Sequence, residues 1–291
     1  MSRVVVIGAT GHIGSYLVPR LVRGGHDVVA ISRGARAPYH DSPEWQRVTT
    51  VTADRDAEDA AGTFGARIAA LRPDVVMDMI CFTAASARQL VEALLLHETR
   101  AGGVPATVLH PGHISGPGWP VVTPAGNLDP HVWTRLATGQ PLALPDHGLG
   151  VLHHVHADDV AQAFEQALLR PFAAGGSYHV VSPQAMTLRG LATGVAGWFG
   201  RAPVLDFVDW PEFERRAGAG HALTTREHTF RSITASIDRS RETLGYAPRY
   251  SSLAALREAL AWLVAHGQAD IGGQHLPGQD PVPEESRPLP G

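Results

Sequence analysis

The feature that most constrains this chain is a glycine-rich turn close to its amino terminus. The β-branched run Val4–Ile7 leads into Gly8, Gly11 and Gly14, and a helical pattern starts at Ile13. The first glycine permits a tight turn, the second lets the backbone approach a pyrophosphate, and the third permits close packing of helix on strand. The start of the helix adds free N–H groups and a positive dipole end. This order predicts a dinucleotide-binding turn; a purely structural tight turn is the alternative.

Short apolar runs alternate with helical patterns along the first part of the chain. Such alternation is typical of βαβ units, which build a parallel sheet. We expect strands at 3–7, 27–31, 48–52, 74–80 and 106–110, and helices at 13–22, 57–71 and 84–101. The uninterrupted apolar stripe of the last helix predicts that it is continuous and that the strands on either side of it are neighbours. Further on, Asp158 is expected to cap a helix that runs to Leu169.

The predicted elements divide the chain into two regions and a tail. Residues 1–115 are expected to form an α/β domain with a Rossmann-type doubly wound parallel sheet, to which residues 150–182 return. Residues 116–149 and 183–267 are expected to form a smaller, C-terminal substrate-binding region. Gly, Pro and Gln dominate the rest, so residues 268–291 are predicted to be disordered.

Composition excludes several classes of protein. With 24 basic residues, 28 acidic residues and a net charge of −4, the chain has no basic footprint for nucleic acid. The single cysteine, Cys81, excludes a disulfide framework and a Cys-based zinc cluster. No apolar run approaches the roughly 18 residues of a membrane span, and we find no signal-peptide pattern. A cytoplasmic protein without a membrane partner is expected.

Four motifs together resemble one family, the NAD-dependent epimerase/dehydratase group of the extended short-chain dehydrogenase/reductase superfamily. They are the turn 8–14, the run 110–117, the run 154–161, and a final pair at 237–239 and 244–248. The resemblance implies a Rossmann fold and an NAD(P)-dependent oxidoreductase or epimerase acting on a sugar nucleotide or related small molecule. It also implies cofactor contacts at Gly8, Thr10, Gly11, His12, Ile13, Gly14, Cys81 and Ile114.

The end of the second strand indicates which dinucleotide is preferred. An acidic residue there would bind a ribose 2′-hydroxyl, whereas an arginine accommodates a 2′-phosphate. This strand ends at Arg33, with Arg36 close behind. The sequence therefore favours NADP over NAD as cofactor, although a surface arginine near a loop is also commonplace. Asp54 is similar in position to the family's adenine-contacting aspartate, and a helix N-cap is an equal alternative.

The catalytic pair that the resemblance implies is missing. The family uses Tyr-x-x-x-Lys on one helix, where the ammonium lowers the pKa of the tyrosine and holds the ribose. All the cations of this chain are arginine, so none of its five tyrosines has a lysine partner. Tyr16 has Arg20 four residues on, but arginine is a poor substitute for a compact ammonium. On the order of 30 residues, one strand-plus-helix unit, are expected to be absent between Leu94 and Leu95.

For several other polar residues the sequence suggests weaker hypotheses about function. His113, in the loop expected beside the nicotinamide, is the one candidate for a substitute acid or base, against a plain loop histidine. His154 and His156 would share a strand face, which permits two metal ligands, but we expect no metal there. Cys81 is expected to line the cofactor cleft as a small buried residue rather than as a reactive thiol.

Two functions remain open at this point. The first is an NAD(P)-dependent epimerase/dehydratase or reductase. The second is a catalytically impaired dinucleotide-binding protein that serves as a sensor, regulator or partner subunit. The expected partners are the dinucleotide and a small-molecule substrate, without nucleic acid or membrane, and a homodimer is one arrangement open to the chain.

Overall fold

The computed structural model describes residues 1–97 and 105–276. Residues 277–291 of the predicted disordered tail lie outside these described residues, and so does the end of the helix predicted at 84–101. The start of that tail, residues 268–276, is not disordered as predicted, because Ile271 and Leu276 are buried in a hydrophobic core. No helix within the described parts of the chain is both long and apolar enough to cross a membrane.

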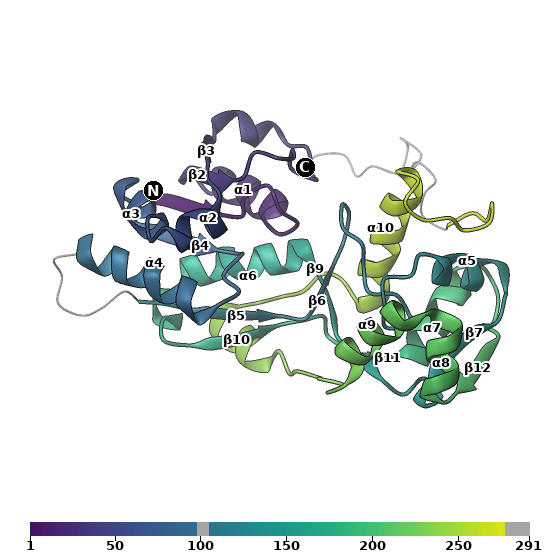
Figure 1. The fold of residues 1–291 in the computed structure, drawn as a ribbon. Coiled ribbons are helices and arrows are strands. Elements are labelled where there is room, and N and C mark those ends of the chain that lie inside the picture. Colours follow the sequence, from purple (N-terminus) through teal and green to yellow (C-terminus); the bar gives the residue numbers. More distant parts are fainter. Residues whose placement is uncertain (98–104, 277–291) are drawn as a thin grey trace. The chain divides into compact units, whose positions relative to one another are not determined.

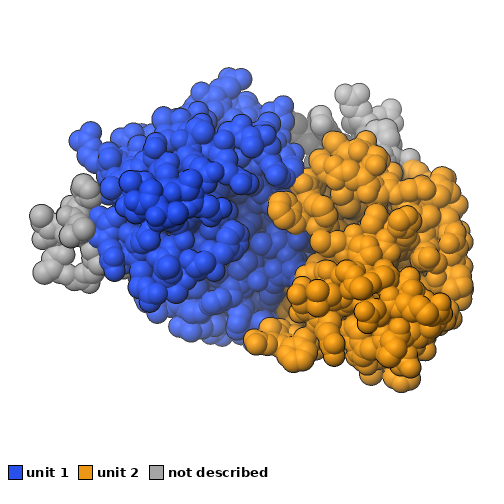
Figure 2. Space-filling model, viewed as in Figure 1, with its two compact units in different colours: residues 1–116, 155–183, 235–250 blue, residues 117–154, 184–234, 251–291 orange. Residues whose placement is uncertain are grey.

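The chain folds into two compact units, each assembled from separate stretches of sequence (Figure 2). The first unit contains residues 1–116, 155–183 and 235–250, and the second contains the residues between and after them. The short stretch 235–250 thus belongs to the first unit, whereas the division from sequence placed it in the substrate-binding region.

The first unit is built on a four-stranded parallel sheet in the order β3-β2-β1-β4. Its strands are β1 (Arg3–Ile7), β2 (Asp27–Ser32), β3 (Thr49–Thr52) and β4 (Val75–Asp78). Val4 and Val6 face one hydrophobic core, whereas Val5 and Ile7 face another. Strands buried on both faces read as continuous apolar runs rather than as alternating ones, which explains the sequence of β1.

Helices cover both faces of this sheet (Figure 1). Leu17 of α1 (Gly14–Arg23) and Val160 of α6 (Ala157–Leu169) pack in the same core as Val4. Ile68 of α3 (Phe64–Ala70) and Leu90 of α4 (Ala84–His97) pack in the same core as Val5. The doubly wound α/β fold is therefore confirmed.

One predicted helix is wrong. The single helix expected at 57–71 is two helices, α2 (Arg55–Ala60) and α3, separated by Gly62 with a φ of +68°. A residue in the left-handed region ends the first helix, and glycine adopts it without a steric penalty. The helix expected from residue 84 is continuous through Leu94 and is described to His97.

The predicted neighbour of β4 is also wrong. β5 (Val108–Pro111) pairs in parallel with β10 (Ser177–Val180), and in the described chain β4 pairs only with β1. Tyr178 and Val180 of β10 are buried in the same core as Val160 of α6, and β5 pairs with this buried strand. A further short pair joins β6 (His113–Ser115) to β9 (His154–His156).

The second unit is mainly helical around its own core. Trp133, Leu191 and Leu260 are buried together there. Thr187 and Ser251 cap α7 and α10 by accepting backbone N–H bonds, as serine and threonine do at helix starts. Its helices are α5 (His131–Thr138), α7 (Leu188–Trp198), α8 (Trp210–Ala217), α9 (Ala219–Thr229) and α10 (Ser252–Ala265). Its strand pairs are β7 (Leu142–Pro145) with β12 (Leu205–Val208), and β8 (Val151–Leu152) with β11 (Met186–Thr187).

Candidate functional site

The glycine turn lies at the carboxyl edge of the sheet, between β1 and α1. Gly8 has a φ of +85°, and its N–H and that of Ala9 both donate to the Ile31 carbonyl, at 3.0 and 3.1 Å. A Cβ on Gly14 would lie 2.2 Å from the Ala9 carbonyl oxygen. Gly8 is therefore required by backbone conformation and Gly14 by crowding against the turn itself, rather than against the strand as expected.

The start of α1 faces this turn without a side-chain cap. Its N-cap residue, Ile13, offers no acceptor, and its first turn contains no acidic residue. The positive end of the helix dipole is thus not neutralised locally, which favours an anion. Thr10 is half-buried in the turn, and the buried His12 side chain points away from it toward Gly116.

Two exposed arginines follow the end of β2. Within residues 1–97 and 105–276, Arg33 makes no hydrogen bond or ion pair, and no carboxylate lies within ion-pair distance of either Arg33 or Arg36. Arg36 Nη1 donates to the hydroxyl of Tyr39. This part of the carboxyl edge therefore presents uncompensated positive charge beside the glycine turn.

Asp54 acts as a helix cap in the structure. Its Oδ1 accepts the Ala57 N–H at 3.2 Å, at the start of α2. The next residue, Arg55, is buried and donates through Nη1 to both carboxylate oxygens of Asp78, while its Nε donates to Asp59 at 3.2 Å. Burial lowers the pKa of Arg55, but the bonds to Asp78 outweigh it and the net pKa is raised. This network ties the ends of β3 and β4 together.

Cys81 lies just beyond β4, beside that network. Its thiol donates to the Thr83 carbonyl at 3.7 Å, and the residue is exposed. Burial of the sulfur raises the pKa of the thiol, and the Asp78 carboxylate raises it further. Since the thiolate is the nucleophile, the raised pKa argues against a reactive thiol. The burial expected for Cys81 is wrong, because the residue is exposed.

The structure brings the glycine turn and the run 113–116 together. A Cβ on Gly116 would lie 3.3 Å from His12 Nε2 and 2.9 Å from His156 Nε2. His113 and Ile114 are half-buried on β6, and Ile114 packs against the core shared by α1 and α6. The predicted site residues of the turn and of β6 are thus neighbours in the first unit.

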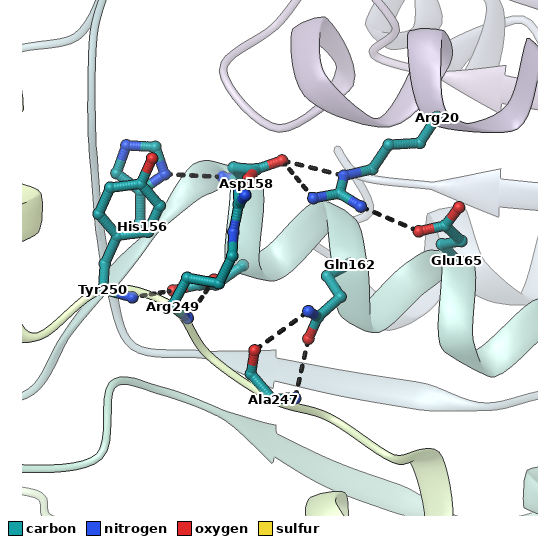
Figure 3. Close-up of polar contacts among 9 residues, drawn as sticks. Arg20, His156, Asp158, Gln162, Glu165, Ala247, Arg249 and Tyr250 are labelled. Atoms are coloured by element: carbon teal, nitrogen blue, oxygen red, sulfur yellow. Dashed lines mark hydrogen bonds and ion pairs between the residues drawn. The ribbon is translucent and has the colours of Figure 1, made fainter. Parts of the chain in front are cut away.

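The acidic residues of the 154–161 run make hydrogen bonds and ion pairs within the first unit (Figure 3). His156, not Asp158 as predicted, caps α6, because its Nδ1 accepts the Asp158 N–H at 3.0 Å and leaves the Asp158 carboxylate free for Arg20. Arg20 donates to Asp158 at 2.9 and 2.8 Å and to Glu165 at 3.1 Å. Within the described chain, no group of three His, Cys, Asp or Glu side chains could hold a metal ion.

Asp159 holds a distant segment of the first unit. Its carboxylate is fully buried and accepts the backbone N–H groups of Arg249 and Tyr250 at 2.8 and 3.1 Å. Burial raises the pKa of Asp159, and these two donors offset it only in part. The Tyr250 ring stacks on the His156 ring at 3.8 Å (Figure 3). Sequence reasoning missed these links, although Asp158-Asp159 at a helix start was a visible signal.

The tyrosines of this chain have no lysine to pair with. Tyr16 stacks on His40, and Arg20, which lies four residues after it, is bound by Asp158. Tyr178 and Tyr246 are buried and donate to backbone carbonyls at 3.3 and 3.1 Å. Burial raises the pKa of Tyr246 well above its usual range, so this phenol does not supply a proton near neutral pH.

The second unit contains a cavity of about 280 Å³. Its lining includes apolar Val132, Leu142 and Phe213 and charged Asp129, Arg135 and Arg216. Such a mixture of apolar walls and a few polar groups is typical of small-molecule sites.

Comparison with known proteins adds to this geometry. The model of the NAD dependent epimerase/dehydratase family matches residues 4–89 and 84–181, which is more than half of the chain. The two matched segments overlap over residues 84–89, in the first part of α4, which precedes the position predicted for the missing unit.

Among curated proteins, the chain is similar to chloroplast stem-loop binding protein of 41 kDa b from Arabidopsis thaliana. The two are 21% identical over 301 residues, covering 88% of this chain and 78% of that protein.

Among solved structures it is similar to UDP-glucose 4-epimerase from Thermotoga maritima, with a TM-score of 0.61 and 15% identity, covering 91% of this chain and 99% of the other. UDP-glucose 4-epimerase of Thermus thermophilus in complex with NAD gives a TM-score of 0.58 at 18% identity, covering 90% and 99%. Both likenesses are of fold.

Proposed function

The chain belongs to the NAD dependent epimerase/dehydratase family, and from this we propose that it binds an adenine dinucleotide at the glycine turn. The observation that supports a pyrophosphate there is the uncapped start of α1, whose first turn carries no acidic residue. The backbone at Gly11, His12 and Ile13 would hold the pyrophosphate.

The other cofactor contacts predicted from the sequence are proposed from where each residue lies around the glycine turn. Cys81, beyond β4, and Ile114, on β6, would line the nicotinamide half of the ligand, with Thr10 beside the turn. Asp54 would contact the adenine while it caps α2, since a carboxylate has two oxygens and the cap uses one of them.

We further propose that NADP(H) binds more tightly than NAD(H). The observation that carries this is Arg33, which is exposed, without an ion-pair partner in the described chain, and at the end of β2 where the ribose would lie. An arginine–phosphate contact is charge-assisted, and such hydrogen bonds contribute about 1.5–3 kcal/mol, so roughly tenfold in affinity.

Calorimetric titration with NADP+ and NAD+ tests this preference. Arg33→Ala is expected to remove most of the preference by weakening NADP+ binding alone. Arg47→Ala is the matched control, because Arg47 is also exposed but precedes β3 at the opposite edge of the sheet. Equal affinities in the unchanged protein, or an Arg33→Ala variant that keeps the preference, would contradict the proposal.

Two roles for the bound cofactor remain candidates. Family membership supports the first, which is epimerase/dehydratase or reductase chemistry on a sugar nucleotide or related small molecule. There the nicotinamide would exchange a hydride with the substrate, and the protein would have to move a proton. The absence of lysine supports the second, a dinucleotide-binding protein in which the proton step is impaired. We favour the second for this chain.

The expected rate is therefore far below that of an intact relative. Positioned general acid–base catalysis contributes about 10²–10⁴-fold, and loss of a ribose anchor adds to that through orientation. His113 is the one replacement we nominate, since imidazole titrates near neutral pH.

A nicotinamide absorbance assay over a panel of sugar nucleotides tests this. It compares the chain with a version in which a strand-plus-helix unit carrying Tyr-x-x-x-Lys is restored after Leu94. Equal rates for the two would refute impairment, and His113→Ala would then show whether that histidine had taken over the proton step.

The second unit is proposed as the substrate-binding region. The lining of its cavity offers apolar side chains for a ring and two arginines for an anionic group, together with the carboxylate of Asp129. Arg216 is already paired with Glu212 and Asp206, which leaves Arg135 as the better donor.

A further inference from the structure

The loop that follows β2 is attached directly to the glycine turn. The Tyr39 N–H donates to Ser15 Oγ at 2.9 Å, and that hydroxyl in turn donates to the Gly11 carbonyl at 2.8 Å. Ser15 is fully buried in the first turn of α1. The far end of the loop is thus fixed to the same backbone that is proposed to hold the pyrophosphate.

Ring contacts reinforce this attachment. The His40 ring stacks on Tyr16 of α1, with centroids 5.4 Å apart and planes 10° apart. The Tyr39 ring lies edge-on to His12, with centroids 6.1 Å apart. Pro38 fixes its own φ and restricts the residue before it. The second half of the loop therefore has little conformational freedom, although its first half is exposed.

Tyr39 connects the fixed half of the loop to the exposed half. Its hydroxyl accepts a hydrogen bond from Arg36 Nη1, and the guanidinium carbon lies 5.9 Å from its ring centroid. Arg36 is exposed and has no carboxylate partner in the described chain. Nη1 of the Arg36 guanidinium is hydrogen-bonded to Tyr39, and the other N–H donors of this guanidinium stay available for an anion.

We propose that Tyr39 is a positioning residue for the 2′-phosphate of NADP(H), acting through Arg36. The inference rests on the dinucleotide function proposed above and adds a second arginine and its support to the role of Arg33. An unrestrained arginine loses much side-chain freedom when it binds, so orienting it beforehand strengthens binding. Selection of the phosphorylated cofactor then depends on a tyrosine that does not itself touch the phosphate.

The test is Tyr39→Phe, which keeps the ring, the backbone bond to Ser15 and the contact with His12 but removes the hydroxyl. Dissociation constants are measured by calorimetry for NADP+ and NAD+, and for 2′,5′-ADP and 5′-AMP. We expect NADP+ and 2′,5′-ADP to bind about threefold to tenfold more weakly. NAD+ and 5′-AMP should bind as before. Tyr178→Phe, the same change in the core of this unit, should leave all four affinities unchanged.

A double-mutant cycle with Arg36→Ala separates positioning from general damage to the loop. In the Arg36→Ala background, Tyr39→Phe should have no further effect on NADP+. Independent, additive effects would overturn the inference, and so would a Tyr39→Phe variant that loses NAD+ and NADP+ affinity equally.

Failure of the proposed NADP(H) preference gives a different experimental result from failure of the proposed role of Tyr39. If the unchanged protein binds NADP+ and NAD+ equally, both proposals are wrong. If it prefers NADP+ and Tyr39→Phe keeps the full preference, only the role of Tyr39 is wrong.

Discussion

Arg20→Ala is expected to destabilise the first unit far more than loss of an ordinary surface arginine. Arg20 lies on α1, directly after the glycine turn, and its guanidinium joins this helix to Asp158 and Glu165 of α6 (Figure 3). Removing it leaves the Asp158 carboxylate, whose side chain is only 7% exposed, with Arg249 alone.

The magnitude follows from burial and from the number of bonds lost. Arg20 makes two hydrogen bonds to Asp158 and one to Glu165, and its side chain is 20% exposed. Breaking a buried ion pair by removing one partner costs about 3–5 kcal/mol. Because Arg249 still reaches Asp158 and water reaches part of the site, we expect a loss of about 3 kcal/mol.

Urea unfolding at neutral pH, followed by far-UV circular dichroism, measures this loss. Arg67→Ala is the control within the same unit, since Arg67 pairs with Glu58 at 2.7 Å but its side chain is 47% exposed. An exposed pair contributes about 0–1 kcal/mol. If Arg20→Ala cost no more than Arg67→Ala, the argument from burial would be refuted.

Three further outcomes are expected. Gly14→Ala should abolish NADP+ binding in calorimetry, because the new methyl would lie 2.2 Å from the Ala9 carbonyl oxygen; retained binding would contradict the described turn. Alkylation of Cys81 by iodoacetamide, followed by intact mass, should still accelerate at a pH where free cysteine has reached its plateau, because burial and Asp78 raise the pKa of the thiol. A plateau at the same pH as free cysteine would count against that environment. Ala143→Trp should fill the cavity of the second unit and weaken binding of the sugar nucleotide for which the unchanged protein proves to have affinity, without changing NADP+ affinity; unchanged sugar-nucleotide binding would contradict the proposed substrate site.

The glycine turn and the strands of the parallel sheet could be predicted from local sequence. Gly8 and Gly14 are required by conformation and crowding within a few residues, so their spacing alone predicts the turn. The apolar run of β1 likewise follows from burial on both faces, and this property needs no knowledge of its partners. The predicted Rossmann fold therefore agrees with the structure.

Features that depend on distant partners were not predictable in the same way. Arg20 and Asp158 are 138 residues apart, and nothing near either residue specifies the other. The pairing of β5 with β10 likewise joins Val108 to Ser177, two residues that lie far apart in the sequence. The sequence predicts Asp158 as the cap of α6 because aspartate is a common cap. In the structure Arg20 binds the Asp158 carboxylate, and His156 caps the helix instead.

The interleaved order of the two units has a consequence for synthesis on the ribosome. The first unit is completed only when residues 235–250 have been made, because Asp159 receives the backbone of Arg249 and Tyr250. At about 5–20 residues per second, α1 waits on the order of ten seconds for α6 and longer for that last segment. Meanwhile Leu17 and Leu21 have no cover from α6. The nascent chain thus carries an apolar helix face through much of its translation, and a chaperone that binds such faces would meet it before the fold closes.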